Sequence, residues 1–457
     1  MKTAFSLVGA CLLAGCSVPL IRPNAQQTVA EQYSTAKPAG SAALDVNWWS
    51  RIGDPQLTEL LSLAQTNSPD LRSAAASVMS ARAQAGQSRA DFFPSVTGQA
   101  SSTVSDSDAG RRSETSSMLL DASWEVDLLG RVRNASRADI TRAEAEEMSY
   151  AGSYVSLAAE VADDYVEYRA CRLAEADYRE ARASQQETLE ATRSLVDAGM
   201  SANSDLSLAG ANVASAQINL TQQHADCQIA AQSLAKAVGV SQGQIDAILA
   251  KGGGLPKAKP FQVAAVPADM LRQRPDVIEA EKRFAASLLD LKVAQANLYP
   301  SLTLGGSVTL SDATSWSFGP ALSLPILDGG ASKSKVRVAN ADALTAAESY
   351  RSAVLTAVAE VEGALTRLAA ARANVASAES LVQQYQAYFD AVDEDWKAGG
   401  ASLLDREEAR RQVQSARITR ITQRRTLLGQ WITLYKAVGG GWVPPTQLSP
   451  AKSKAAT

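Results

Sequence analysis

Short stretches of the chain alternate between apolar and polar residues. The alternation is clearest at residues 301–310, where most even positions are apolar and serines and threonines take most odd ones. Residues 316–324 and 120–128 show the same period of two. Strands of roughly ten residues with one apolar and one polar face suit a soluble sheet with one buried side or a membrane barrel. The pattern predicts two such strands in each half of the chain.

Long stretches between the strands show helical periodicity instead. Residues 131–198 contain no proline and only one glycine, Gly152, which predicts one helix of about 68 residues, roughly 100 Å long. Residues 331–397 repeat this pattern, and each long helix is followed by a glycine-containing turn and a returning helix, at 203–239 or 402–437. Shorter helices are expected at 69–91 and 275–298, so that two stacked helices run beside each long one. Apolar residues step by three and four along the helices, as in coiled coils: Leu206, Ala209, Val213, Ala216 and Leu220, and Tyr154, Leu157, Val161, Tyr165 and Tyr168.

The chain is an internal duplication. Pro69-Asp70 recurs as Pro275-Asp276 at a spacing of 206, whereas Ala198-Gly199 recurs as Ala398-Gly399 at a spacing of 200. The difference is attributed to a polar loop that is longer in the first copy, from Ser105 to Ser117, than in the second, from Ser311 to Ser315. Repetition on this scale indicates an architecture and not a single catalytic pocket.

The two copies and the chain ends define the expected domains. Residues 1–15 have the lysine and apolar run of a secretory signal, and Leu13-Ala14-Gly15-Cys16 resembles a bacterial lipobox, with Cys16 as the lipidated residue. An ordinary signal peptide with a chance cysteine is the alternative. The other expected segments are a tether at 16–54, a first repeat at 55–250, a linker at 251–265, a second repeat at 266–440 and a flexible tail at 441–457.

Composition narrows the class of function. The net charge is -4, the pI is about 5.4, and basic and acidic residues are mixed along the chain, which argues against a nucleic-acid partner. His224 is the one histidine, and no cluster of cysteines and histidines has the spacing of a metal site. The sequence shows no nucleophile paired with a base, no phosphate loop and no carboxylate pair. We therefore expect neither an enzyme nor a cofactor.

Membrane crossing, if it occurs, is expected through the strands. After Cys16 no run of about 18 apolar residues could form a transmembrane helix. Four strands cannot close a barrel, because natural barrels begin at about eight strands. The chain must then oligomerise, with a dimer giving eight strands and a trimer twelve.

Cys171 and Cys227 are equidistant from Gly199, 28 residues before it and 28 after it. In an antiparallel hairpin that turns at Gly199 they lie at the same height. Facing helices in an oxidising compartment can join such cysteines in a disulfide, and two small packing residues are the alternative. The second copy lacks this pair, so the bond would be a local staple.

Six segments are distributed over nearly the whole mature chain: Asn47-Trp48-Trp49, Gly53-Asp54-Pro55-Gln56-Leu57, Arg274-Pro275-Asp276, Leu298-Tyr299-Pro300-Ser301-Leu302, Trp316-Ser317-Phe318-Gly319-Pro320 and Leu434-Tyr435-Lys436-Ala437-Val438-Gly439-Gly440-Gly441-Trp442. Together, and in this order, they resemble the TolC/OprM family of outer-membrane efflux lipoproteins of the NodT type.

The resemblance implies a mostly α-helical protein with membrane β-strands. It implies a homotrimer whose four strands per chain form a twelve-stranded barrel in the outer membrane of a Gram-negative bacterium, continued by a helical barrel through the periplasm. The expected function is a passive exit duct that docks with a periplasmic adaptor and an inner-membrane transporter, of the resistance-nodulation-division type. A type I protein-secretion channel shares this fold and is the main alternative. A periplasmic adaptor lipoprotein fits less well, because it would have one hairpin and no set of four strands.

The resemblance also points to a periplasmic gate near the helical turns. Glu408 and Arg411 fall at family positions that carry an acidic and a basic residue at the aperture, and Trp396 falls where relatives often have tyrosine. Asp205 and Asp405 occupy equivalent places in the two copies. Three copies of a carboxylate around a narrow axis attract cations and can pair with arginine to latch the tip. Ordinary solvated charge at a helix end is the alternative.

Two further groups of acidic residues have simpler interpretations. Glu125 and Asp127 lie on the polar face of a strand and are candidates for the barrel lumen, where charge tunes ion selectivity. The run Asp393-Glu394-Asp395 is expected to face solvent.

Overall fold

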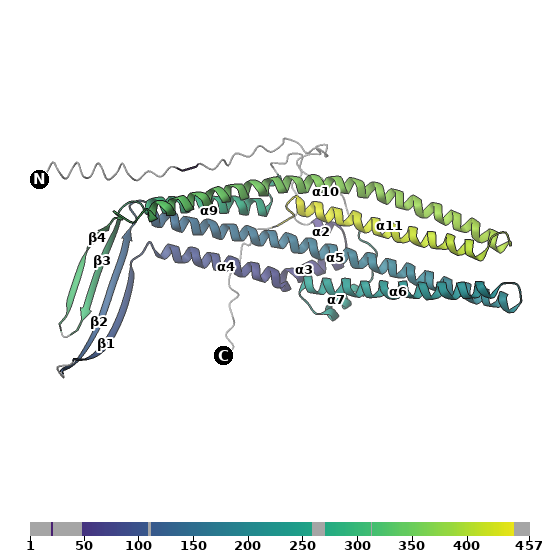
Figure 1. The fold of residues 1–457 in the computed structure, drawn as a ribbon, viewed down its shortest axis with the longest axis horizontal. Coiled ribbons are helices and arrows are strands. Elements are labelled where there is room, and N and C mark those ends of the chain that lie inside the picture. The colour runs from purple at the N-terminus through teal and green to yellow at the C-terminus, as the bar shows by residue number, and fades with distance from the viewer. Residues whose placement is uncertain (1–19, 22–47, 108–110, 258–269, 312, 443–457) are drawn as a thin grey trace.

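The computed structural model describes residues 20–21, 48–107, 111–257, 270–311 and 313–442. These form an elongated molecule with a four-stranded sheet at one end and two helical turns at the other (Figure 1). Cys16, most of the tether and nearly all of the C-terminal tail lie outside the described residues.

The two halves of the chain contain the same elements in the same order. The first half comprises α4 (Pro69–Ala90), β1 (Ser95–Ser107), β2 (Arg111–Val126), α5 (Arg131–Asp197) and α6 (Asn203–Val238). The second comprises α9 (Pro275–Ala296), β3 (Ser301–Leu310), β4 (Ser315–Ser323), α10 (Ala331–Lys397) and α11 (Leu403–Ala437). Three short helices flank the first set: α2 (Trp48–Arg51), α3 (Pro55–Asn67) and α7 (Gln242–Leu249). The predicted long helices are confirmed to within two residues at each end.

Each long helix runs beside two shorter ones. α5 packs against both α4 and α6, and α10 packs against both α9 and α11. α5 also contacts α9 and α11, so it connects the two halves. Many of its buried residues are small, among them Ala158, Ala159 and Ala162, which lets neighbouring helices approach closely. Within the described ranges, no helix combines the length and the apolarity needed to span a bilayer.

The strands form one antiparallel sheet in the order β1-β2-β3-β4. The register places Leu120 opposite Val308, and Val308 opposite Trp316. Directly opposed residues share a face of the sheet, so the alternating apolar sets merge into one apolar face. In the single chain this face is open, and Trp316 and Phe318 are 78% and 74% exposed. The polar face carries serine pairs, including Ser307 and Ser317 with their Oγ atoms 2.9 Å apart.

The predicted loop from Ser105 to Ser117 is wrong. β1 continues to Ser107 and β2 starts at Arg111, so most of this segment is a paired hairpin that extends beyond the end of β3. The Oγ atoms of Ser101 and Ser117 lie 3.0 Å apart, and Ser116 donates to Ser102 at 3.1 Å. These hydroxyl pairs stabilise strands that lack apolar alternation, which is why the sequence pattern did not reveal them.

Four of the six segments that carry the family resemblance meet where the stacked helices end, whereas the segments at 298–302 and 316–320 lie at the sheet. The Trp48 ring stacks on Tyr435 at a centroid distance of 5.0 Å. Asp54 caps α3 by accepting from two backbone N–H groups, and its other oxygen accepts from the Tyr165 hydroxyl at 2.8 Å. Arg274 donates to the carbonyl oxygen of Ala437 at 2.5 Å and pairs with Asp276 at 2.6 Å. We call these contacting residues the mid-height cluster.

Glycines end the returning helices at the mid-height cluster. Gly239 follows α6 with a φ of 76°, and a Cβ atom there would lie 2.5 Å from the carbonyl oxygen of Asn67. Gly439 is its counterpart after α11, with a φ of 99° and 3.0 Å to the carbonyl oxygen of Gln273. Glycine is required at both positions because the chain turns back beside another backbone.

We expect Gly239→Ala to lower the midpoint of thermal unfolding by about 3 °C or more, because it adds backbone strain and a clash with a backbone oxygen. Circular dichroism of the purified protein in detergent measures this midpoint. Gly243→Ala is the matched control, since a Cβ at Gly243 in α7 meets no other atom within 4 Å. Equal midpoints for the two variants would contradict the assignment of Gly239 to a tight approach.

Candidate functional site at the helical tip

Both helical turns lie at the end of the molecule farthest from the sheet (Figure 1). Gly199 and Gly399 make the turns with φ values of 72° and 81°, which explains the repeated Ala-Gly landmark. The returning helix α11 begins with a capping box, in which the backbone N–H of Asp405 donates to Ser402 Oγ at 3.2 Å and the backbone N–H of Ser402 donates to Asp405 Oδ2 at 3.1 Å. In the first copy, Ser201 donates to Asp205 at 2.6 Å.

Asp205 and Asp405 thus occupy equivalent places at the starts of the returning helices. Hydrogen bonds from the side chain and backbone of Ser402 hold the pKa of Asp405 below its ordinary value. The carboxylate is therefore charged across the physiological pH range, as a cation-attracting ring requires.

Glu408 and Arg411 pair with each other within α11, three residues apart. Their side chains are 48% and 51% exposed. Hydrogen bonds from Arg411 and Gln412 lower the pKa of Glu408. This pair does not connect two helices of the chain, so a latch built on it needs a partner from a neighbouring chain.

Trp396 and Asp393 together hold Arg406. The Arg406 guanidinium lies 4.5 Å from the centre of the Trp396 ring, and its Nε contacts Asp393 Oδ1 at 2.5 Å. Lys397 pairs with the other oxygen of Asp393 at 2.6 Å. Burial pushes the pKa of Asp393 up, but the hydrogen bonds from Lys397 and Arg406 outweigh burial and keep that pKa below its ordinary value.

The run Asp393-Glu394-Asp395 was expected to face solvent. This prediction is wrong for Asp393, whose side chain is only 14% exposed, although Glu394 and Asp395 are exposed. A helix turns by about 100° per residue, so one member of an acidic run can face a neighbouring helix while the next two face water.

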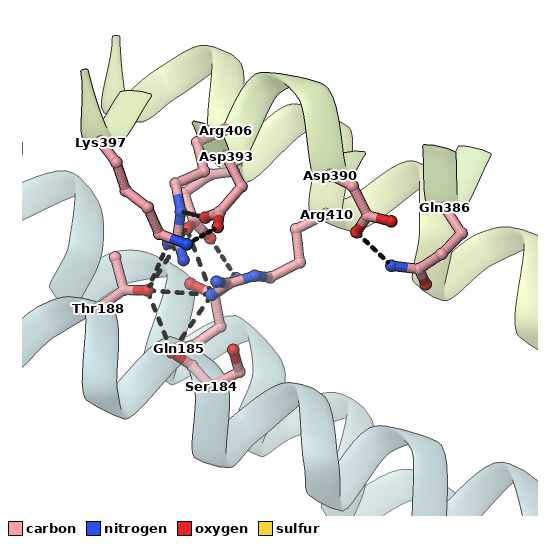
Figure 2. A network of polar contacts seen from close by, with 10 residues as sticks. Ser184, Gln185, Thr188, Gln386, Asp390, Asp393, Lys397, Arg406 and Arg410 are labelled. Atoms are coloured by element: carbon pink, nitrogen blue, oxygen red, sulfur yellow. Dashed lines mark hydrogen bonds and ion pairs between the residues drawn. The ribbon is translucent and has the colours of Figure 1, made fainter. Parts of the chain in front are cut away.

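A buried carboxylate, Glu407, joins α11 to α5. Its side chain is 2% exposed and accepts from Gln185 Nε2 at 2.6 Å. Arg410 lies 3.4 Å from Glu407 and donates to Thr188 Oγ1 at 3.0 Å and to the carbonyl oxygen of Ser184 at 3.3 Å. Figure 2 shows side chains from α5, α10 and α11 converging here. We call the following set the inter-hairpin lock: Gln185, Thr188, Asp393, Arg406, Glu407 and Arg410.

Burial makes this lock sensitive to the loss of any charge. Desolvation lowers the pKa of Arg410, and the nearby Arg406 lowers it further, whereas the charge of Glu407 opposes both. Removing one partner from a buried pair leaves an uncompensated charge, which typically costs about 3–5 kcal/mol.

Further ion pairs join α11 to α5 between the inter-hairpin lock and the mid-height cluster. We call this line of contact between the two helices the seam. Arg417 contacts Glu180 at 3.1 Å, and Arg425 contacts Asp163 at 2.9 Å and Glu167 at 2.6 Å. The two hairpins of one chain are therefore tied together by arginines of α11 and carboxylates of α5. Each exposed pair contributes little by itself, of the order of 0.2–1 kcal/mol.

The inter-hairpin lock could not be predicted from the sequence pattern. Its residues on α5 and α11 lie more than 200 positions apart in the chain, and a glutamate flanked by arginines gives no sequence signal of burial. The recurrence of arginine at 406, 410 and 417 on one side of α11 is the signal that could have indicated an acidic partner helix.

Cys171 of α5 and Cys227 of α6 are joined in a disulfide, with their Cα atoms 5.5 Å apart. Gln223 donates to Cys171 Sγ at 3.0 Å. One turn away, His224 Nδ1 lies 3.3 Å from the buried carboxylate of Glu175, which gives the histidine a structural contact. The disulfide crosses the first hairpin only.

Glu125 and Asp127 lie at the junction between β2 and α5. Glu125 pairs with Arg131 at 2.7 Å, and Asp127 accepts from the backbone N–H groups of Val132 and Arg133 at 3.1 and 3.0 Å. Asp328 makes the same kind of contact at the start of α10. Both candidates thus stabilise the start of a long helix, and a lumen position for them stays a prediction.

No group of three or more metal-ligating side chains is placed to hold a metal ion anywhere in the described ranges. The candidate site is therefore a set of charged residues at and above two helical turns.

Comparison with known proteins agrees with this architecture. The family described as "Outer membrane efflux protein" matches residues 60–240 and 266–440, one match for each copy. Nodulation protein T of Rhizobium leguminosarum bv. viciae is 28% identical over 97% of this chain and 94% of its own length. The toluene efflux pump outer membrane protein TtgC of Pseudomonas putida is also 28% identical, over 97% and 95%. The solved structure of the outer-membrane channel OprN superposes with a TM-score of 0.83 at 28% identity, covering 92% of this chain and 99% of that one.

We expect Glu407→Ala to destabilise the folded protein by about 3–5 kcal/mol, because Arg406 and Arg410 lose a buried counter-charge. Denaturant unfolding followed by circular dichroism measures the loss. Glu408→Ala, one position along the same helix, is the control and should lose much less stability, because the Glu408 side chain is exposed. If both variants unfold alike, the buried carboxylate does not hold the seam.

Proposed function

This chain belongs to the outer membrane efflux protein family and is an outer-membrane efflux channel, and we propose that it acts as the passive exit duct of a three-part pump. The observation that carries this proposal is the division of the molecule into a sheet with an open apolar face and a long helical part with hairpin turns at its far end. A lipid-facing sheet continued by helices can carry molecules across the periplasm and the outer membrane together.

The proposed assembly is a homotrimer. The sheet has two edge strands, β1 and β4, and a sheet of four strands cannot close on itself. Three chains joined edge to edge give a twelve-stranded barrel, and the two hairpins of each chain give six hairpins in the periplasmic wall. A detergent-extracted complex with the mass of three chains is expected, and a monomer or dimer would contradict the trimer.

The proposed partners are a periplasmic adaptor and an inner-membrane transporter of the resistance-nodulation-division type. The name of TtgC makes it part of a toluene efflux pump, which supports a pump-driven role for this chain. Cys16 is the proposed lipid attachment site, which would hold the N-terminus in the outer membrane. The transported molecule is not specified by the duct, because an open passage selects cargo weakly.

The proposed gate lies at the helical tip. Asp405 and Asp205 are fixed at the helix starts, and three copies of each would form acidic rings that favour cations. Behind them, the inter-hairpin lock holds α11 against α5, so that α11 cannot move outward until Glu407 and Arg410 lose their contacts. Arg406 stacked on Trp396 links the same region to α10. Glu408 and Arg411, exposed on α11, are proposed to reach a neighbouring chain.

Single-channel recording in planar bilayers tests the channel and its gate together. The wild type is expected to form a cation-selective pore of low conductance. Glu407→Gln keeps the side-chain size but removes the charge, so it should raise the conductance several-fold by loosening α11. The double variant Glu408→Ala with Arg411→Ala should also raise it, if the pair latches onto a neighbouring chain.

Glu379→Gln is the control for these recordings, since Glu379 forms an exposed pair with Arg424 on the same hairpin, away from the tip. Its conductance should equal that of the wild type. Absence of any pore would contradict the channel, whereas a pore unaffected by Glu407→Gln and by the double variant would contradict only the gate.

A further inference from the structure

An open cavity of about 500 Å³ lies between α5, α6 and α11. It is above the inter-hairpin lock and beside the disulfide, and its walls come from both hairpins of one chain. Much of the surface is apolar, with contributions from Ala170, Ala174, Ile229, Ile418 and Ile421. Ile421 is buried, whereas Ile229 on α6 is 58% exposed and leaves an apolar wall open to solvent.

The carboxylate of Asp164 borders this cavity without a direct partner. Arg425, whose charge acts to lower the pKa of Asp164, already pairs with Asp163 at 2.9 Å and with Glu167 at 2.6 Å. Within the part of the chain that the structure describes, no hydrogen bond or ion pair engages Asp164 itself. Burial first, and then the charges of Glu160 and Asp163, raise the pKa of Asp164 to about 6.

The charge balance around the cavity favours one class of ligand. Its charged lining residues are Asp164, Glu167, Asp226 and Arg425, which gives three negative charges against one positive. An anion would meet repulsion from every carboxylate. A bare metal ion would find no set of three or more ligating side chains among the described residues. A cation that also carries apolar surface satisfies both the unpaired carboxylate and the isoleucine walls.

We propose that this cavity binds hydrophobic organic cations, with the cationic group at Asp164 and the apolar body against Ile229, Ile418 and Ile421. Such a ligand would contact α5 and α6 of the first hairpin and α11 of the second. It would therefore stabilise the present arrangement of the seam between them. This binding site is independent of the tip residues and does not require that the proposed gate be correct.

Ethidium binding to the purified full-length protein in nonionic detergent tests the proposal, with fluorescence anisotropy at pH 7.5 as the readout. Asp164→Asn is expected to weaken binding at least tenfold. Ile229→Ser changes an exposed wall residue outside the packed core, and it should weaken binding as well. Fluorescein, an anionic dye of similar size, should not bind.

Asp177→Asn is the matched control, because Asp177 is another carboxylate on α5 whose pKa is raised by burial but which lies in a different cavity beside Arg417. It should bind ethidium like the wild type. Unchanged binding in Asp164→Asn, or an equal loss in Asp177→Asn, would overturn the proposal.

Acidification gives a second readout. The charged groups facing Asp164 are Glu160, Asp163 and Glu167 on its own helix, Arg425 on α11 and Asp226 on α6. Protonation of Asp164 removes the charge that the cation needs, so affinity should fall as the pH drops through about 6. The Asp164→Asn variant should lack this step, and a step that persists in the variant would assign it to another group.

Discussion

The packing of α5 is the interaction on which the rest of the structure depends. This one helix contacts α3, α4, α6, α9 and α11, and so touches both copies of the repeat. Its buried positions are small or medium-sized along most of its length, which keeps its neighbours close without a wide globular core. Its start is fixed by the carboxylate of Asp127 and its lower end by the inter-hairpin lock. The sheet, the mid-height cluster and the helical tip therefore keep a fixed relation through a single rigid element.

Much of the fold could be predicted because the sequence clearly marks where helices end and where the chain turns. The absence of proline over residues 131–198, the Ala-Gly turns and the period of two in the strands each depend on neighbours in the chain, and each was interpreted correctly. The paired hairpin of β1 and β2 beyond Met118 was missed because its strands carry hydroxyls where the prediction required apolar residues. Sequence periodicity reports burial of apolar side chains, and it fails where strands are stabilised by polar pairs.

The candidate site was predictable only in part, for a related reason. Family resemblance indicated the tip, but it singled out Glu408 and Arg411, which are exposed and pair within one helix. The neighbouring Glu407 is nearly inaccessible and is the residue that bridges α11 to α5. Arg406, Glu407 and Glu408 are consecutive charged residues, and the sequence does not show which of them faces the neighbouring helix. That depends on the rotation of α11 about its axis, which is set by contacts with a helix more than 200 residues earlier in the chain.

The disulfide between Cys171 and Cys227 makes the two copies mechanically unequal. It joins the two helices of the first hairpin roughly 40 Å above the turn, since 28 residues, most of them helical, separate each cysteine from Gly199. The bond joins α5 to α6 at this height, so the two helices of the first hairpin cannot slide past or separate from each other there. The second hairpin has no cross-link at this height and is the more compliant of the two. In a trimer of such chains, cross-linked hairpins would alternate with hairpins that lack the bond. The motions of the wall would then have threefold symmetry, although the six hairpins look alike.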